Sequence, residues 1–237
     1  MNQLELQKNA FLQLGLSYDN GLQLFNEIYS KILSKIFNGR PTSQHQILFS
    51  SISFKNEIKT ILEIGTFDGT NAKFLSALFP EANIITLDLE DSDDLFIKSY
   101  DRQNSEKRES FVRSRNFVLS TCRNVQFIQK NSIYYLQYET KKFDLIWVDG
   151  AHGYPFVTID ITNSLKLLNR GGFLICDDVF KEKKQSDSFY SSIASMQTLL
   201  AFMNAKVISE FNLILKRFNN EEKYIAIVKE KNIFNPK

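Results

Sequence analysis

The chain of 237 residues is long enough for one α/β domain with a full hydrophobic core, and its 29 basic and 27 acidic side chains leave a net charge of +2. This near-neutral balance argues against a nucleic-acid partner and against an anionic membrane. No apolar run approaches the roughly 18–20 residues of a membrane span, and the first residues lack the order of a signal peptide, so we expect a cytoplasmic protein. Cys122 and Cys176 fit neither a disulfide framework nor a zinc site, so we expect both to be reduced and structural.

The first part of the chain is predicted to be helical. From Asn20 to Phe37, apolar residues recur at steps of three and four, which is typical of an amphipathic helix. The turn sequence at 38–41 ends this helix, and a second helix begins with Thr42 or Ser43 as its N-cap. We therefore expect residues 1–57 to form a helical appendage, whose apolar faces offer a surface for a homodimer.

A strand, a glycine turn and a helix follow one another in the next part of the chain. Residues 60–64 suit a buried central strand, and Gly65 and Gly69 are points where the backbone can turn sharply or approach a ligand closely. A helical pattern over residues 71–79 then ends at Pro80. In open α/β sheets, a nucleotide-like ligand binds at such a turn.

Strands and helices alternate through the rest of the chain, which implies parallel strands joined by right-handed crossovers. Residues 211–218 and 223–229 are joined by a short polar link that permits only an antiparallel hairpin. We therefore predict that residues 58–237 form one doubly wound, Rossmann-like α/β domain. Its mostly parallel seven-stranded sheet ends in the antiparallel hairpin, and residues 91–124 form a helical insertion. The other expected strands span 83–89, 125–129, 143–149 and 172–177, and the later helices span 155–168 and 188–203.

Polar side chains follow each of the first three strands. Asp68 lies in the glycine turn, where its carboxylate would repel a phosphate but suits a cationic or amino-acid ligand. Asp88 comes about twenty residues after the turn, the spacing at which a carboxylate accepts the hydroxyls of a ribose. Asn131 and Ser132 follow the third strand and could bind the edge of an adenine. S-Adenosylmethionine therefore fits better than NAD, although a tight turn without a ligand would use the same glycines.

Asp149, Asp177 and Asp178 follow the two later strands of the predicted sheet. The carboxyl ends of parallel strands meet at one edge, so we expect these carboxylates on the same rim as the glycine turn. Three such oxygen ligands would form a magnesium or calcium site; alternatively, Asp177 caps the following turn and the others bond backbone amides. His152 could act there as a general base at neutral pH, whereas His45 is assigned to the surface or an interface of the N-terminal helices.

Two stretches of the sequence resemble the class I S-adenosylmethionine-dependent methyltransferases, and within them the metal-dependent O-methyltransferases. The first, TSQHQILFSSISFKNEIKTILEIGTFDGTNAKFL, is similar to the catechol and caffeoyl-coenzyme A type in its L-E-I-G-T-x-x-G turn. The second, FDLIWVDGAHGYPFVTIDITNSLKLLNRGGFLICDDVF, resembles the branch that methylates sugars of macrolide antibiotics, with its I-D-G-x-H-x-Y signature. Together they cover roughly Thr42 to Val179.

The resemblance implies roles for individual residues. It implies that His152 is the base, at a point where the catechol-type enzymes use a lysine. It places magnesium at Asp149, Asp177 and Asp178, although asparagine is usual at the last of these positions in the catechol type. An acidic residue is common in the family at the position of Asn131. The expected cofactor-binding residues are Glu63, Gly65 and Asp68 with Gly69 around the methionine, Asp88 at the ribose, and Asn131 and Ser132 near the adenine.

We therefore predict an S-adenosylmethionine-dependent O-methyltransferase, with Mg²⁺, that methylates a hydroxyl of a small molecule or sugar. In this hypothesis the cation lowers the pKa of the acceptor hydroxyl and His152 removes the proton. One alternative is a metal-independent methyltransferase that acts on nitrogen or on a nucleic-acid base, against which the neutral net charge argues. Another is a non-catalytic cofactor-binding module. The acceptor stays open, because the aromatic residues of the insertion suit a sugar ring as well as an aromatic ring.

Overall fold

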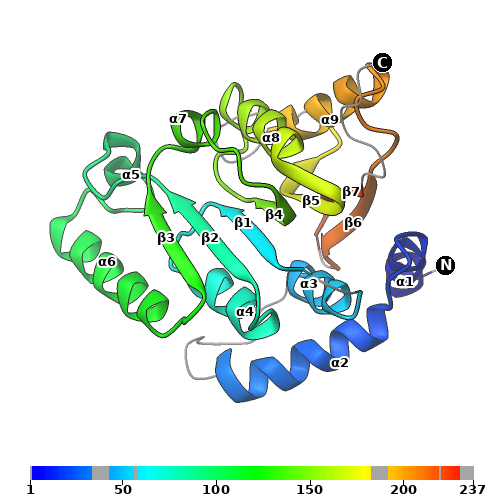
Figure 1. The fold of residues 1–237 in the computed structure, drawn as a ribbon, viewed down its shortest axis with the longest axis horizontal. Helices are drawn as coiled ribbons and strands as arrows, with labels where there is room; N and C mark the ends of the chain where they lie inside the picture. Colours follow the sequence, from blue (N-terminus) through cyan, green and yellow to red (C-terminus); the bar gives the residue numbers. More distant parts are fainter. Residues whose placement is uncertain (1, 34–42, 56–57, 183–191, 219, 230–237) are drawn as a thin grey trace.

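The computed structural model describes residues 2–33, 43–55, 58–182, 192–218 and 220–229. In this part of the chain, seven strands form one sheet in the order β3-β2-β1-β4-β5-β7-β6 (Figure 1). The strands are β1 Thr60–Ile64, β2 Asn83–Asp88, β3 Val125–Gln129, β4 Phe143–Val148, β5 Leu168–Phe180, β6 Asn212–Arg217 and β7 Asn220–Lys229.

The strand order creates a reversal point beside β1. This strand pairs in parallel with both β2 and β4, so the chain first builds one side of the sheet and then returns to build the other. Ligands of doubly wound sheets bind at such a point, beyond the carboxyl ends of the strands. Because β7 is antiparallel to both β5 and β6, strand β6 runs in the same direction as β5. The predicted fold class, with its terminal antiparallel hairpin, is confirmed.

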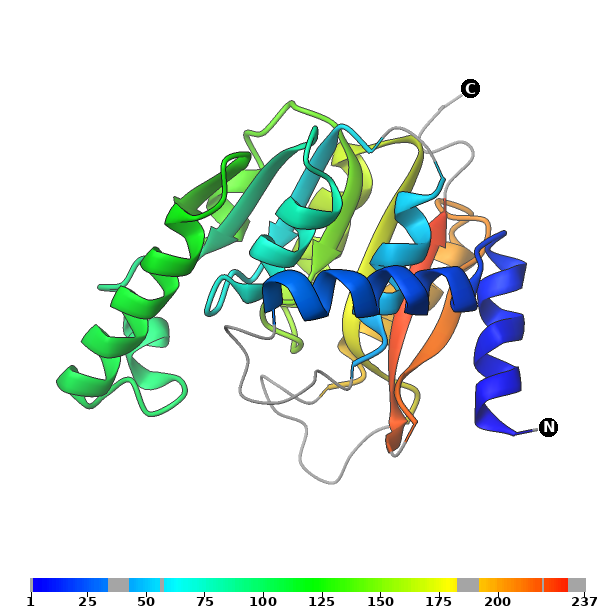
Figure 2. The ribbon, with the colours of Figure 1, turned by 90° about the horizontal axis from the view of Figure 1, so that it is seen from below.

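Helices cover both faces of the sheet. On one face lie α2, α3 and α4, with α2 running across the strands (Figure 2), and on the other lie α7, α8 and α9 (Figure 1). Helices α5 and α6 fall within residues 91–124, where an insertion is predicted, and lie beyond β3, and α1 packs on the edge strand β6. The helices are α1 Gln3–Gln13, α2 Tyr18–Ile28, α3 His45–Ser53, α4 Thr70–Leu78, α5 Asp94–Lys98, α6 Ser105–Ser120, α7 Ser132–Leu136, α8 Phe156–Leu167 and α9 Ala194–Asn204, and a π-helical turn at Tyr29–Leu33 continues α2.

Two hydrophobic cores lie between the sheet and its helices, because successive side chains of a strand point to opposite faces. Ile61 and Trp147 belong to the core that includes α2, α3 and α4, and Leu62 belongs to the core under α8 and α9. Phe11 of α1 lies in the same core as Trp147. The helices of residues 1–57 therefore pack onto the sheet, while the division of the chain at residue 58 stays a prediction.

Most of these elements are predicted from the sequence, but two helices are missed. Helices α1 and α7 have no counterpart among the expected elements. The helix expected from Asn20 to Phe37 corresponds to α2 and the π-helical turn, and residues 34–41, which include its expected end, lie outside the described residues. The expected helix at 188–203 corresponds to α9, and its first residues also lie outside them.

The N-cap of α3 corrects one prediction. The capping residue is Gln44, not Ser43, and Thr42 lies outside the described residues. Ser43 lies one residue before the cap, and its hydroxyl is 2.7 Å from Nδ1 of His45, the first residue of the helix. Both cysteines are free, as expected. Among the described residues, no helix has the length and apolar character needed to cross a membrane.

Candidate active site

A cavity of about 490 Å³ opens at the carboxyl ends of β1, β2, β4 and β5. This volume falls within the range of roughly 300–1,000 Å³ of ligand-binding cavities. One end, called here the turn end, is formed by Gly65, Asp88, Asn131, Ser132 and Asp160. The other, called the rim end, is formed by Asp149, His152, Asp177 and Asp178. The sheet therefore brings four of the predicted cofactor-binding residues, Gly65, Asp88, Asn131 and Ser132, into one cavity with the four predicted rim residues.

The glycine turn links the two ends. Gly65 has φ of +101°, a conformation that favours glycine, and a Cβ at this position would lie 2.3 Å from the backbone oxygen of Asp149. The amides of Gly65 and Thr66 both donate to the carbonyl of Leu87 at the end of β2. Gly69, with φ of +77°, is the N-cap of α4. A side chain at Gly65 would therefore push β1 away from the end of β4.

Asp88 lies where the ribose-binding carboxylate is expected. One of its oxygens accepts a hydrogen bond from the amide of Phe67 at 2.8 Å, and the other accepts from Leu89, also at 2.8 Å. Burial raises the pKa of Asp88, against the opposing effect of these two amides. The carboxylate lines the cavity, and the two amide hydrogen bonds fix its orientation there.

Asn131 and Ser132 also line the cavity, at the start of α7. The Asn131 side chain caps this helix by accepting from the amide of Ile133 at 3.0 Å. Asp160, on α8, is a cavity residue that the sequence reasoning misses; it is 2% exposed. Its Oδ1 has no hydrogen-bond partner among the described residues, and burial raises its pKa to about 6 despite a hydrogen bond with Ser132.

Glu63 and Asp68 do not reach the cavity wall in the described structure. Glu63 is fully buried and accepts hydrogen bonds from Asn71 at 2.8 Å and from Thr86 at 2.5 Å, and burial raises its pKa to about 7. Asp68 accepts from the amide and the hydroxyl of Thr70, at 2.9 and 2.6 Å, at the start of α4. Both carboxylates therefore hold the glycine turn in place, and their contact with a cofactor stays a prediction.

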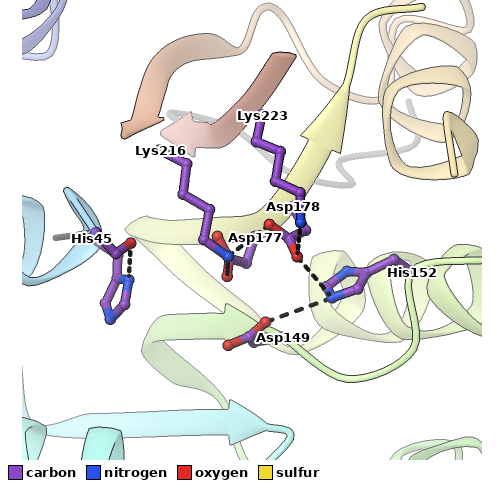
Figure 3. Close-up of polar contacts among 8 residues, drawn as sticks. His45, Asp149, His152, Asp177, Asp178, Lys216 and Lys223 are labelled. Atoms are coloured by element: carbon purple, nitrogen blue, oxygen red, sulfur yellow. Dashed lines mark hydrogen bonds and ion pairs between the residues drawn. The ribbon is translucent and has the colours of Figure 1, made fainter. Parts of the chain in front are cut away.

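A bulge in β5 directs two consecutive carboxylates to the rim end. Successive residues of a regular strand point to opposite faces. The register between β5 and β7 shifts between Cys176 and Val179, and Asp178 has φ of +48°. As a result, Asp177 and Asp178 both reach the Nζ atom of Lys216, each at 2.6 Å (Figure 3).

Lys216 and Lys223 enter the rim end from the C-terminal hairpin (Figure 3). Lys216, on β6, has a side chain only 12% exposed, and Lys223, on β7, donates to Asp178 at 3.0 Å. Burial alone would raise the pKa of Asp177, but attraction to Lys216 lowers it to about 2. Asp149 differs, because burial and the charge of Asp177 raise its pKa well above the usual range. The sequence reasoning misses both lysines.

His152 lies at the rim end with Asp149 and Asp178. Its Nε2 is 3.7 Å from an oxygen of Asp149 and 3.9 Å from an oxygen of Asp178 (Figure 3). The side chain is almost fully buried, and this burial lowers its pKa, although the carboxylates of Asp178 and Asp177 oppose the effect. The ring is therefore neutral at pH 7 and able to accept a proton.

His45, the second histidine, packs against aromatic rings of the core. The ring of His45 packs 5.2 Å from that of Trp147 and 5.6 Å from that of Phe49. Burial lowers its pKa to about 4, with the charge of Asp177 acting in the opposite direction. His45 thus lies at the interface between α3 and the sheet, one of the two places that the sequence allows for it.

Comparisons with known proteins identify the family of the central part of the chain. The family described as "Methyltransferase domain" matches residues 62–179, which contain the glycine turn and all three rim carboxylates. No curated protein matches the sequence. The family match and the fold together show that the chain belongs to the class I S-adenosylmethionine-dependent methyltransferases.

Three solved structures share the fold. The O-methyltransferase from Bacillus cereus in complex with SAH is 17% identical, with 89% of this chain and 90% of that chain covered and a TM-score of 0.54. The O-methyltransferase TomG from Streptomyces achromogenes, in complex with SAM, is 16% identical over 97% and 99% of the two chains, with a TM-score of 0.51. The SAH-bound methyltransferase PaMTH1 from Podospora anserina is 17% identical over 90% and 88%, with a TM-score of 0.55.

Proposed function

We propose that the protein transfers the methyl group of S-adenosylmethionine to a hydroxyl oxygen of a small molecule or sugar. The observation that carries this proposal is the position of His152, a buried and neutral imidazole in the same cavity as the glycine turn. A base next to a cofactor pocket suits an acceptor that must lose a proton, as a hydroxyl does. The two O-methyltransferases of the same fold, which hold SAH and SAM, support the choice of cofactor.

The proposed cofactor lies along the turn end. Asp88 accepts the ribose hydroxyls, because its carboxylate is exposed to the cavity and already oriented by two amides. Asn131 and Ser132 contact the adenine, and the backbone at Gly65 lies against the methionine part. This order leaves the sulfonium methyl facing the rim end, where His152 lies.

The proposed reaction needs one proton transfer and one methyl transfer. His152 takes the proton of the acceptor hydroxyl, and the carboxylate of Asp178, 3.9 Å from its Nε2, stabilises the imidazolium that forms. The acceptor oxygen then attacks the methyl carbon, its carbon–sulfur bond breaks, and S-adenosylhomocysteine leaves as a neutral thioether. Placing the two reactants in line provides much of the acceleration.

The predicted magnesium ion does not fit the described residues as they are arranged. Asp177 and Asp178 each give an oxygen to the ammonium of Lys216 at 2.6 Å. Within the described ranges, no three His, Cys, Asp or Glu side chains are placed to hold a metal ion together. Mg²⁺ requires near-octahedral oxygen ligands at about 2.0–2.1 Å. The magnesium requirement therefore stays a prediction of the sequence, and the proposed reaction takes no step through it.

Two experiments test the proposed function. Isothermal titration with S-adenosylhomocysteine measures cofactor binding, which we expect in the micromolar range. Incubation with methyl-labelled S-adenosylmethionine and a panel of sugars, phenols, amines and RNA then identifies the acceptor class. We expect label only in the hydroxyl compounds. A chain that binds no S-adenosylhomocysteine, or that labels only amines or RNA, would overturn the proposal.

The cytoplasmic location and the homodimer also remain proposals. Support for the homodimer comes from α1, where Leu6 and Leu12 are 54% and 65% exposed. Such side chains would be covered if two copies paired through their N-terminal helices. Sedimentation analysis of the wild type and of Leu6→Ser/Leu12→Ser tests this, and a wild-type monomer would contradict it.

A further inference from the structure

We propose that Lys216 takes the place of a divalent cation at the rim end, so that methyl transfer by this chain is independent of metal. The inference rests on the proposed function and goes beyond it, because it assigns the positive charge beside the acceptor oxygen to a side chain. It also makes Lys216 a residue that the acceptor contacts.

Lys216 makes the contacts that a metal ion bound between the rim carboxylates would make. Its Nζ lies 2.6 Å from an oxygen of Asp177 and 2.6 Å from an oxygen of Asp178, which are two of the three predicted metal ligands. These charge-assisted hydrogen bonds are short, and the Lys216 side chain is only 12% exposed. A metal ion on the same oxygens would lie next to a buried ammonium, which like-charge repulsion opposes.

The backbone of Lys216 is fixed by its two neighbouring elements, strand β7 and the start of helix α3. The register between β6 and β7 shifts between Leu215 and Arg217, so that Lys216 lies at an irregularity of its strand. Its carbonyl accepts a hydrogen bond from the amide of Gln44, the N-cap of α3, at 2.9 Å. Two strand irregularities, this one and the bulge at Asp177 and Asp178, thus bring the ammonium and the two carboxylates together.

Lys223 provides an internal comparison. It also pairs with Asp178, the one carboxylate that it contacts among the described residues, and its side chain is 30% exposed. It lies in regular register opposite Phe180, with its Nζ 5.4 Å from the centre of that ring. A lysine at the surface of the cluster adds charge without filling the space between the carboxylates. The two lysines therefore separate the effect of added charge from the effect of position.

The position of Lys216 also gives it a role in the reaction. An ammonium has three N–H donors, and in the described structure two of them bond Asp177 and Asp178. Lys216 lines the cavity, so its third N–H is available to the acceptor oxygen. As His152 removes the proton, this donor stabilises the negative charge that develops on the oxygen, which is the role of a preorganised cation in a dry site.

Binding of Mn²⁺ to metal-free protein, measured by electron paramagnetic resonance, tests the inference without any turnover. We expect no Mn²⁺ bound by the wild type at millimolar concentration, and at least tenfold tighter binding by Lys216→Ala, in which Asp177 loses its ammonium partner and Asp178 keeps only Lys223. The double variant Lys216→Ala/Asp177→Asn should lose that binding, and the matched control Lys223→Ala should not gain it. Wild-type binding of Mn²⁺ that Asp177→Asn abolishes would overturn the inference.

Turnover gives a second, separate readout. Methyl transfer by the wild type should be unchanged by a chelator, and Lys216→Met, which keeps the length of the side chain, should lower kcat by roughly 10²–10³-fold. Titration with S-adenosylhomocysteine shows whether this variant is folded. Loss of wild-type activity in the chelator would overturn the inference while leaving the proposed function intact. Failure of the wild type to bind S-adenosylhomocysteine would instead overturn the proposed function, whatever the Mn²⁺ result.

Discussion

The turn end and the rim end of the cavity are built in different ways. At the turn end, Gly65 and Asp88 are held by hydrogen bonds with backbone groups of β2 and of the turn itself. At the rim end, Asp177 and Asp178 are held by Lys216, which lies 39 and 38 positions further along the chain. The first is a local arrangement, and the second depends on strand order. Substitutions at the turn end should therefore change cofactor binding, whereas substitutions at the rim end should change turnover.

The largest effect is expected at the rim end, on removal of the base. His152→Gln should lower kcat by roughly 10²–10⁴-fold, because the acceptor then keeps its proton. Binding of S-adenosylhomocysteine should change by less than about threefold, because the proposed cofactor contacts at Gly65, Asp88, Asn131 and Ser132 do not include His152. Steady-state kinetics and calorimetry on the same preparation measure the two quantities. Wild-type turnover in His152→Gln would show that another group is the base.

The pH dependence of turnover identifies this histidine. Burial lowers the pKa of His152, so the neutral form persists below the ordinary value of 6.5. The rate of the wild type should therefore fall as the pH drops, with a midpoint below 6.5. The chain has two histidines, and His45→Gln is the matched control. His45→Gln should keep this acid limb, and the residual activity of His152→Gln should lack it.

The next effect is expected where the two ends meet, at Gly65. A Cβ there would lie 2.3 Å from the oxygen of Asp149 and the residue has φ of +101°, so Gly65→Ala should lower the free energy of unfolding by about 2–5 kcal/mol and abolish cofactor binding. Gly171 is the matched control, because it has φ of +80° with no atom within 4 Å of the added Cβ. Gly171→Ala should cost only about 1–2 kcal/mol and leave binding unchanged. Equal losses in urea unfolding would mean that strain at φ, and not the approach to Asp149, makes glycine necessary.

Features that depend on local sequence could be predicted, whereas features that depend on the order of distant strands could not. The turn, with Gly65, Gly69 and Asp88, follows from glycines at a strand end and from a fixed spacing, both of which are local. Three rim carboxylates and His152 could be predicted because they follow strand ends in the same parallel sheet. Lys216 could not, because its place depends on β6 running parallel to β5 two strands away, and on an irregularity within β6.

Asp160 is a different kind of omission. In α8 it shares the buried face with Val157, Ile161 and Ser164, where the helical period calls for apolar residues. A carboxylate at such a position is a signal of function, because its burial is costly. Asp160 could not be found from the ends of strands, because it lies within a helix. Glu63, in contrast, is found from its motif but lies behind the cavity wall.

Asp160 and Glu63 therefore form a matched pair, since both are buried carboxyls with raised pKa values and only one lines the cavity. A raised pKa means that the folded state binds more protons than the unfolded state, so stability falls as the pH rises. This loss occurs between about pH 4 and pH 6 for Asp160, and between about pH 4 and pH 7 for Glu63. Asp160→Asn and Glu63→Gln should each remove this loss, which amounts to at most about 3 kcal/mol at pH 8. Thermal unfolding at pH 5 and pH 8 measures it.

Asp160→Asn and Glu63→Gln should differ in cofactor affinity, although by less than the changes in turnover and stability predicted above. Asp160 lines the cavity and its buried Oδ1 has no partner among the described residues, so we predict that a donor of the cofactor bonds its carboxylate. Asp160→Asn should weaken S-adenosylhomocysteine binding about tenfold, since a hydrogen bond to a charged group contributes roughly 1.5–3 kcal/mol. Both oxygens of Glu63 are already bonded, to Asn71 and Thr86, so Glu63→Gln should change affinity less than about threefold. If calorimetry shows a larger loss of affinity for Glu63→Gln than for Asp160→Asn, Glu63 contacts the cofactor, as the family resemblance implies. Asp160 is then a buried carboxyl of the core without a role in binding.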